Sequence, residues 1–209
     1  MRARKLDTDV RQEQIAEAAL KIIADRGLGG LNMARLARRV GIVPSAIYRH
    51  FEGKEQVLDA VLDLIGSRLR ENVSSVCGEM QNPLEQLHAL LMRHVALIRE
   101  NEAIPRLIFS ESVYGGEPAR RRKLYGIIQG YLKRIADIVK EGQETGQIQS
   151  DIAPEKVAVM FLGMIQPGAI LWHLSDGEFD VTKQAETAWE VFSAALRTRS
   201  HKDGRATDG

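Results

Sequence analysis

Cysteine, aromatic residues and long apolar runs are all scarce in this chain of 209 residues. Cys77 is the only cysteine, which excludes an internal disulfide and a thiolate metal site and leaves a small helical residue or a redox-sensing thiol. Aromatic residues make up only 5% of the sequence, so the chain leans away from β structure. No apolar run approaches the roughly 20 residues that span a bilayer, and the first ten residues contain no apolar core of a signal peptide. We therefore expect a cytoplasmic protein without membrane contact.

Signatures of common catalytic sites are also absent from the sequence. It contains no glycine-rich phosphate loop, no HExxH metal motif, no nucleophile elbow and no Cys–His pair in a recognisable context. His88 and His94 lie six residues apart, a spacing that does not place two metal ligands on one helical face. We therefore expect neither an enzyme nor a bound metal or cofactor.

Charge is divided unevenly along the chain, although the net charge is only +1. The first 55 residues contain eleven Lys and Arg against seven Asp and Glu, whereas the remainder contains eighteen against twenty-one. A basic N-terminal quarter on a mildly acidic body is typical of a DNA-binding head, although a solvated basic face has the same balance. Charge alone therefore permits nucleic-acid binding without establishing it.

Helical periodicity, by contrast, extends along nearly the whole chain. Apolar residues recur at three- and four-residue spacing between Gly, Pro and Asn signals, which predicts an all-α fold of about nine helices. The expected helices cover 10–25, 33–40, 44–51, a segment from Lys54, a segment from Pro83, 103–110, 118–145, 154–174 and 182–198. These helices predict a small head at 1–53, a larger body at 54–199 and a disordered tail at 200–209.

The stretch from Asn32 to Lys54 has the pattern of a helix-turn-helix. Two short helices flank Gly41, their apolar residues fall on one underside, and Pro44 suits the first turn of the second helix. That second helix fits the major groove of B-DNA, and its outward residues supply donors for phosphates and base edges. These outward residues are Val43, Ser45, Ala46, Tyr48, Arg49 and His50. The pattern predicts a protein that binds double-stranded DNA.

At these residues the chain resembles the DNA-binding head of the TetR family of bacterial regulators. The run ARLARRVGIVPSAIYRHFEGKEQVLDAV has the turn glycine at Gly41, Tyr-x-His-Phe at 48–51 and Lys-Glu at 54–55. The resemblance covers residues 10–65 closely, and beyond them it extends to an all-helical body of the expected length. It implies a transcriptional regulator that binds operator DNA as a homodimer.

The resemblance also implies roles for single residues. Tyr48 is expected to bond one phosphate, and Lys54, at a helix N-terminus, another. Further contacts to backbone or base edges are expected from Met33, Arg35, Ser45 and Arg49. The basic residues within 2–5 form either an arm in the minor groove or a frayed terminus.

Two positions depart from the family's pattern. Many members have Ser where this chain has Val43, and Thr where it has Ala46. Without a side-chain cap the helix loses about 1 kcal/mol, which the fixed φ of Pro44 partly offsets. Ala46 can offer a base only an apolar contact with a thymine methyl, so sequence reading is expected to depend on Ser45, Arg49 and DNA shape.

The segment 154–174 is apolar nearly all round, which requires burial on two sides. In the TetR family the last two helices form a four-helix dimer interface, and the resemblance assigns this role to 154–174 and the final helix. The other interpretation is that the pair serves as the core of one protomer. The expected interface residues are Phe161, Leu162, Ile165, Ala169, Trp189, Phe192 and Leu196.

The resemblance further implies a pocket for a small hydrophobic or amphipathic ligand among the middle helices. The candidate lining residues combine apolar bulk with hydrogen-bonding tips: Met92, His94, Phe109, Tyr114, Met164, Gln166 and His173. We predict a repressor that this ligand releases from its operator through the helix beginning at Lys54. The alternative is a DNA-bound regulator that acts through protein partners without a ligand. The basic run 120–123 is either an anion or DNA contact or a solvated face.

Overall fold

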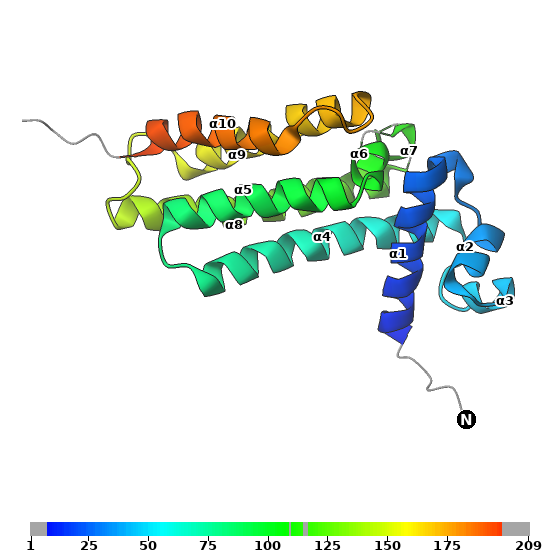
Figure 1. Ribbon diagram of the computed structural model, residues 1–209. Helices are drawn as coiled ribbons and strands as arrows, with labels where there is room; N and C mark the ends of the chain where they lie inside the picture. Colours follow the sequence, from blue (N-terminus) through cyan, green and yellow to red (C-terminus); the bar gives the residue numbers. More distant parts are fainter. Residues whose placement is uncertain (1–7, 109, 115–116, 198–209) are drawn as a thin grey trace, which may run out of the picture.

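A computed structural model describes residues 8–108, 110–114 and 117–197, apart from the side chains of residues 112 and 114, and this part of the protein is all-α (Figure 1). Its ten α-helices and one 3-10 turn are α1 (Thr8–Arg26), η1 (Leu28–Gly30), α2 (Met33–Val40), α3 (Pro44–Ile47), α4 (Lys54–Glu79), α5 (Pro83–Glu100), α6 (Ala103–Ile108), α7 (Glu111–Tyr114), α8 (Pro118–Glu144), α9 (Pro154–Leu174) and α10 (Val181–Leu196). The all-α prediction is confirmed.

The head consists of α1, η1, α2 and α3. Asn32 caps α2, because its side-chain oxygen accepts a hydrogen bond from the backbone N–H of Arg35 at 2.8 Å. Gly41 ends α2 at φ 77°, in the left-handed region that residues with a Cβ rarely adopt. The α-helical part of α3 is shorter than the predicted 44–51: it lacks a side-chain cap and passes into turns after Ile47.

The body is a stack of long helices that run side by side in three layers (Figure 1). α4 forms the lower layer, α5 and α8 the middle layer, and α9 with α10 the upper layer. α4 packs against α5 and α8, α8 packs against α9, and α10 packs against α5 and α9. α1 stands across one end of the stack and packs against α4 and α6, so these helices join the head to the body.

One cluster of buried apolar residues continues from the head into the body. It includes Ile15 of α1, Leu36 of α2 and Ile47 of α3, and it continues through Leu62 of α4 to Phe161 of α9. Burial of such side chains is the main favourable contribution to folding, at roughly 25 cal/mol per Å². Because α4 contributes to this cluster beside both α1 and the body helices, head and body share this helix.

Two features of the body differ from the prediction. Helix α7 lies between the expected helices 103–110 and 118–145, where the sequence predicted no helix. Helix α9 is long and apolar enough to cross a membrane by length and composition, with a mean hydropathy of 1.6, although no such run was expected. Core helices of other proteins can have the same length and composition, but only 33% of the apolar window of α9 is buried. The predicted tail at 200–209 and the basic residues within 2–5 lie outside the described residues.

Candidate DNA-binding surface and body cavity

α2 and α3 form a helix-turn-helix at the end of the molecule that lies away from the body (Figure 1). The N–H of Ile42 donates to the carbonyl of Ala37 at 3.0 Å, and Gly41 supplies the left-handed turn. Leu36 and Ile47 are buried beneath the turn, so the apolar underside is used within the head. The opposite side of α3 is therefore free to enter a DNA groove.

The predicted DNA contacts divide into an outward set and a half-buried set. The outward set is Val43, Pro44, Ser45, Tyr48 and Arg49. Val43 is 61% exposed and Tyr48 is 56% exposed, which leaves both accessible to a large partner. The half-buried set is Met33, Arg35, Ala46, His50 and Lys54. The exposed residues among the predicted contacts thus all lie between 43 and 49, on α3 and the residues next to it.

Two cations of the half-buried set are engaged inside the head. The guanidinium of Arg35 donates to the carbonyl of Gly30, and Nζ of Lys54 donates to the carbonyl of Leu28 at 3.0 Å. Both side chains thereby hold η1 against the starts of α2 and α4. Sequence reasoning missed this role because it joins residues as far apart as Leu28 and Lys54. An ammonium has three donors, so a phosphate can share Lys54 with this carbonyl.

His50 lies between the helix-turn-helix and α1. Its backbone carbonyl accepts a hydrogen bond from the side-chain amide of Gln12 at 3.4 Å. Its Nδ1 is buried and has no hydrogen-bond partner in the described part of the chain. The residue therefore joins the end of the recognition turn to α1, a position that the sequence pattern assigned to the DNA-facing side.

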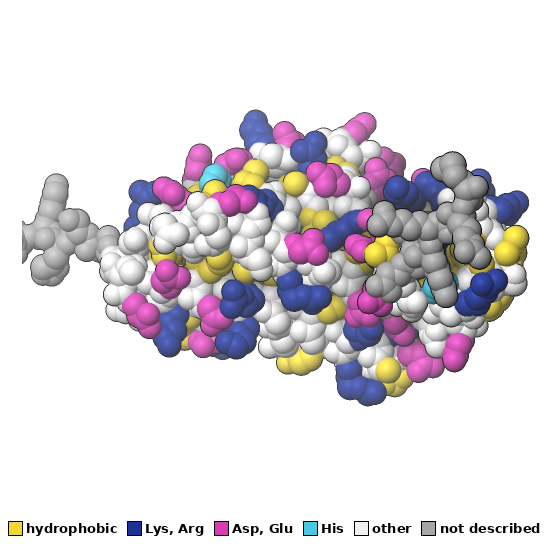
Figure 2. Space-filling view, turned by 90° about the horizontal axis from the view of Figure 1, so that it is seen from below, with side chains coloured by type: hydrophobic (Ala, Val, Ile, Leu, Met, Phe, Trp, Pro, Cys, Tyr) yellow, Lys and Arg dark blue, Asp and Glu magenta, His cyan; other side chains and the backbone are white. Residues whose placement is uncertain are grey.

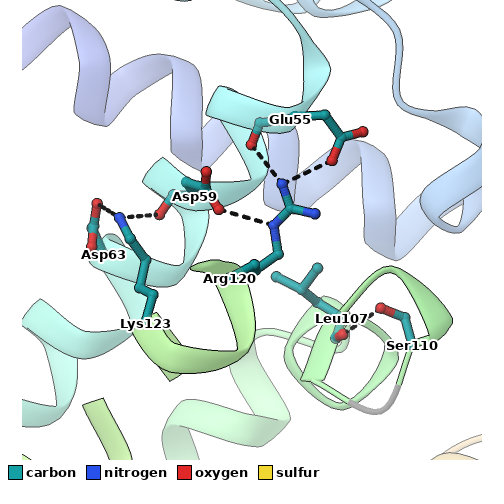
Figure 3. Close-up of polar contacts among 7 residues, drawn as sticks. All are labelled: Glu55, Asp59, Asp63, Leu107, Ser110, Arg120 and Lys123. Carbon is teal, nitrogen blue, oxygen red and sulfur yellow. Dashed lines mark hydrogen bonds and ion pairs between the residues drawn. The ribbon is translucent and has the colours of Figure 1, made fainter. Parts of the chain in front are cut away.

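A cluster of opposite charges joins the start of α8 to the start of α4 (Figure 3). Arg120 is 3% exposed; its Nε lies 2.9 Å from the carboxylate of Asp59, and its Nη2 lies 2.8 Å from that of Glu55. One turn later, Nζ of Lys123 lies 2.6 Å from the carboxylate of Asp63. The three carboxylates recur every four residues on one face of α4. We call these five residues the α4–α8 clasp.

The clasp assigns partners to two residues of the basic run 120–123. Burial alone would lower the pKa of Arg120, but the hydrogen bonds and charges of Asp59 and Glu55 outweigh it and raise that pKa. A buried guanidinium needs such partners because an unpaired buried charge costs several kcal/mol. Arg121 and Arg122 are exposed, so the interpretation of the run as a solvated face applies to these two of its four residues. The four-residue spacing of acids at 55, 59 and 63 was the available sequence signal.

The body contains a cavity of about 80 Å³ between α4, α5, α6, α8 and α9. Its lining is aliphatic, with Ile65, Leu97 and Ile127 among the contributors, except for the three polar side chains of His94, Tyr131 and Gln166. The volume is smaller than the roughly 150 Å³ of an engineered cavity that binds benzene. A ligand of ordinary size, which needs at least about 300 Å³, would have to move these helices apart.

Two of the predicted pocket residues, His94 and Gln166, line this cavity. Met92, Met164 and His173 are not part of its lining. Phe109 and the side chain of Tyr114 lie outside the part of the chain that the structure describes. Sequence reasoning missed Tyr131 and the aliphatic lining, because helical periodicity marks such residues only as core.

His94 of α5 and Tyr131 of α8 form a polar pair in this aliphatic lining. The Tyr131 hydroxyl lies 3.0 Å from Nδ1 of His94, and the two rings meet edge to face with their centroids 5.3 Å apart. Burial lowers the pKa of His94 to about 4 and raises the pKa of the Tyr131 phenol. Both side chains are therefore uncharged at neutral pH.

The outer side of α9 has an exposed apolar surface, which we call the α9 stripe. Its residues are Val159, Met160, Ile170, Leu171 and Leu174, each between 40% and 74% exposed, and Val191 of α10 is exposed as well. They follow helical spacing along one face. An exposed apolar patch of this kind marks a surface that something else covers.

The predicted interface residues lie mostly on other faces of α9 and α10. Phe161, Ile165, Ala169, Phe192 and Leu196 are buried within the protomer, and Leu162 and Trp189 are half-buried. The rings of Phe161 and Phe192 pack edge to face with their centroids 6.3 Å apart, which joins α9 to α10. These five buried side chains face the protomer's own core. The sequence could not predict this, because a helix that is apolar all round does not reveal which face turns outward.

Family models match two consecutive parts of the chain. Residues 15–61 match the model for bacterial regulatory proteins of the tetR family. Residues 64–195 match the model for the C-terminal region of YsiA-like proteins. The two matches meet within α4, the helix that head and body share.

Similar proteins match along most of their length. The chain is 21% identical over 186 residues to the fatty acid metabolism regulator protein of Bacillus subtilis (strain 168), covering 89% of this chain and 95% of that protein. It is 20% identical over 188 residues to the nucleoid occlusion factor SlmA of Vibrio vulnificus (strain YJ016), covering 90% and 96%. The structure of the regulator FadR from Bacillus subtilis in complex with stearoyl-CoA has a TM-score of 0.75 at 21% identity, covering 88% and 98%. This structural likeness shows the fold alone.

Proposed function

Because this chain belongs to the TetR family of bacterial transcriptional regulators, we propose that it represses transcription until a small-molecule ligand releases it from operator DNA. Regulators of this family bind operator DNA and small molecules and act as dimers. We place the protein in the cytoplasm, where operator DNA is found. The proposal has three parts: DNA contact by the head, dimer contact by the body, and a cavity coupled to both.

The observation that carries the proposal is that α4 borders both sites. It begins at Lys54, directly after the recognition turn, and its residues Ile65 and Leu69 line the cavity. Fifteen residues of α-helix separate Lys54 from Leu69, which is about 22 Å along the axis. A ligand that displaces the turn containing Leu69 therefore also moves the start of the helix, where the head is attached.

The α4–α8 clasp supplies a second connection between the cavity and the head. Leu124 and Ile127 of α8 line the cavity, and Arg120, one turn earlier, holds Glu55 beside Lys54 (Figure 3). A ligand that pushes α8 outward would pull on the start of α4 through this guanidinium. In a dimer the two heads must reach half-sites roughly 34–36 Å apart, so a small shift at each head weakens binding.

The lining of the cavity favours a small hydrophobic or amphipathic ligand. Aliphatic walls bind apolar surface, while His94, Tyr131 and Gln166 offer the few polar groups that orient a ligand. The Bacillus subtilis relative binds stearoyl-CoA, an amphipathic acyl thioester. A comparable molecule would require this cavity to expand, and that expansion is the movement that the proposal needs.

The α9 stripe is our proposed dimer interface. It is an exposed apolar surface on the penultimate helix, and Val191 of α10 adds to it. Covering this stripe with the same stripe of a second copy gives the isologous contact of a twofold dimer. Leu162 and Trp189, which are half-buried, lie on the same two helices. A membrane is the other apolar partner that could cover this stripe, and the oligomeric state in solution distinguishes the two.

For DNA contact we propose that Tyr48 bonds a phosphate while Ser45 and Arg49 face base edges or the adjacent backbone. All three are exposed on the free side of the helix-turn-helix. Over the face shown in Figure 2, basic and acidic side chains are intermingled rather than gathered in a single basic patch. Specific contacts from this short surface are therefore proposed to position the head.

A second candidate is a DNA-bound regulator without a ligand that acts through protein partners. The similarity to a nucleoid occlusion factor favours it. The small volume of the cavity, about 80 Å³, also fits a body that takes no ligand. The two candidates differ in whether a molecule in the cavity changes operator affinity.

The test is a titration of ligand against the operator complex. Operator sites are selected from random DNA with the full chain, and their affinity is measured by fluorescence anisotropy with and without stearoyl-CoA. We expect at least a fivefold loss of operator affinity, and an equal loss of stearoyl-CoA affinity when operator is present, since coupling is reciprocal. Binding of stearoyl-CoA without any change in operator affinity would contradict release and favour the second candidate.

A further inference from the structure

The polar pair in the cavity indicates the chemistry of the ligand. We propose that His94 and Tyr131 together present one hydrogen-bond donor to the cavity, and that its ligand is an apolar molecule with an uncharged carbonyl oxygen at that point. Esters, thioesters, ketones and lactones belong to this class. The inference rests on the proposed function, because it requires that the cavity receives a ligand.

The count of hydrogens in the pair carries the inference. A neutral imidazole has one N–H and one bare nitrogen, and a phenol has one O–H. If the Tyr131 hydroxyl donates to Nδ1 of His94, the Nε2–H is left over; if Nδ1–H donates, the Tyr131 O–H is left over. One donor hydrogen therefore remains in either tautomer. Within the described part of the chain, neither side chain has another hydrogen bond.

No protein group in the described part of the chain accepts this hydrogen, and because His94 is half-buried, water can accept it while no ligand is bound. The remaining lining is aliphatic apart from Gln166, which is exposed and can hydrogen-bond to water. A polar hydrogen in an apolar cavity lowers its free energy by binding an acceptor. A carbonyl oxygen on an apolar ligand supplies that acceptor and leaves the rest of the ligand against Leu97, Ile104 and Ile165.

The charge of the cavity argues against an ionised ligand group at this point. Both members of the pair are neutral near pH 7, and the lining contains no Lys, Arg, Asp or Glu. A carboxylate placed there would lose its hydration without gaining a cation. The cavity should therefore distinguish a neutral carbonyl compound from the corresponding acid, as well as from a hydrocarbon.

Three probes of similar size test these distinctions: propiophenone with a neutral carbonyl, propylbenzene without an acceptor, and hydrocinnamate with a carboxylate. Binding to the full chain is measured by ligand-observed NMR titration at pH 7.5. We expect propiophenone to bind about five- to tenfold more tightly than propylbenzene, the effect of one hydrogen bond. We expect hydrocinnamate to bind more weakly than both. Ala169→Leu, which fills part of the cavity, should weaken all three.

Variants of His94 and Tyr131 test whether these two residues cause the preference for propiophenone over propylbenzene. Tyr131→Phe and His94→Leu each retain one donor and should keep most of the preference for propiophenone. The double variant His94→Leu/Tyr131→Phe should bring the ratio of the two affinities close to one. His88→Leu/Tyr125→Phe makes the same two chemical changes at residues outside the cavity lining and should keep the ratio of the unmodified chain. If the double variant does not fold, the three probes still decide the ligand class on the unmodified chain.

The possible outcomes separate this inference from the proposed function. Equal affinity for propiophenone and propylbenzene, or tightest binding of hydrocinnamate, would overturn the inference while leaving a cavity that binds ligands. A preference that persists in the double variant would overturn the role of the pair. No binding of any probe would overturn the inference, whereas the proposed function is decided separately by the stearoyl-CoA titration.

Discussion

The head exposes its candidate contact residues from one short stretch, whereas the body assembles its cavity from five helices. The outward set of the head lies between Val43 and Arg49, on one side of α3 and the following turn. The lining of the cavity extends from Ile65 to Ala169, and its polar pair joins residues 37 positions apart. The candidate contact residues of the head are exposed to an external partner, whereas the polar pair of the body is enclosed by the helices around the cavity.

This difference explains why the two sites are unequally visible in a sequence. A surface that binds DNA needs only a local helix and turn, because the groove of the DNA supplies the other half of the geometry. A cavity is defined by what surrounds it, so residues from distant segments must come together first. The α4–α8 clasp lies between these cases, since regular spacing of Glu55, Asp59 and Asp63 is local but their partners are distant.

The largest effect on operator affinity is expected from a charged substitution in the α9 stripe, which leaves the head unchanged. Leu171→Glu places a charge in the α9 stripe and should produce monomers in analytical ultracentrifugation. Operator affinity should fall by more than about 100-fold, because a monomer retains only half of the DNA contacts. Tyr125→Glu, at an exposed aromatic residue of α8, is the control and should leave dimers intact. Unchanged dimers in Leu171→Glu would place the interface elsewhere.

Acid should weaken the body through His94. Its pKa is 6.5 in the unfolded chain and about 4 in the fold, so the unfolded chain binds the proton more readily between these values. This contribution to stability is complete above pH 6.5 and is lost as the pH falls toward 4, by about 2 kcal/mol between pH 7 and pH 5. His94→Gln should lose this part of the pH dependence in urea unfolding. His88→Gln is the control; an identical pH profile for His94→Gln and the unmodified chain would contradict the assignment.

Removing the central cation of the α4–α8 clasp should lower the stability of the fold and reduce the effect of ligand on operator affinity. Arg120→Met keeps the apolar stem but leaves Asp59 and Glu55 without their cation, and we expect a loss of about 2 kcal/mol in the free energy of unfolding. The change in operator affinity on adding stearoyl-CoA should also shrink. Arg122→Met, at an exposed neighbour, should preserve both quantities. A full ligand response in Arg120→Met would exclude the clasp as a connection.

The smallest effect is expected in the head alone. Tyr48→Phe removes one hydroxyl from the outward set and should reduce DNA affinity about five- to tenfold, equally for all sequences, because a phosphate contact contains no sequence information. Body stability should not change. Tyr125→Phe makes the same chemical change on α8 and should leave DNA affinity unaltered. A change in the preferred DNA sequence would show that Tyr48 contacts a base edge.

Most of the fold could be predicted from the sequence because its signals act within one helical turn. Asn32, Gly41 and Pro44 mark the helix ends where the structure has them, and apolar periodicity marks the long helices of the body. The length of α3 and the presence of α7 were not predicted, since short helical turns depend on neighbouring contacts as much as on their own residues.

The sequence by itself determined an all-α chain, a helix-turn-helix with an outward-facing α3, and an apolar helix α9. Only the tertiary structure decided which face of α9 is exposed, that Lys54 bonds to Leu28, and that Tyr131 meets His94. Helical periodicity predicts the buried face only where polar and apolar residues fall on different faces, and α9 is apolar on nearly all sides. Hydrogen bonds between distant helices depend on where those helices pack, and packing is a property of the whole fold.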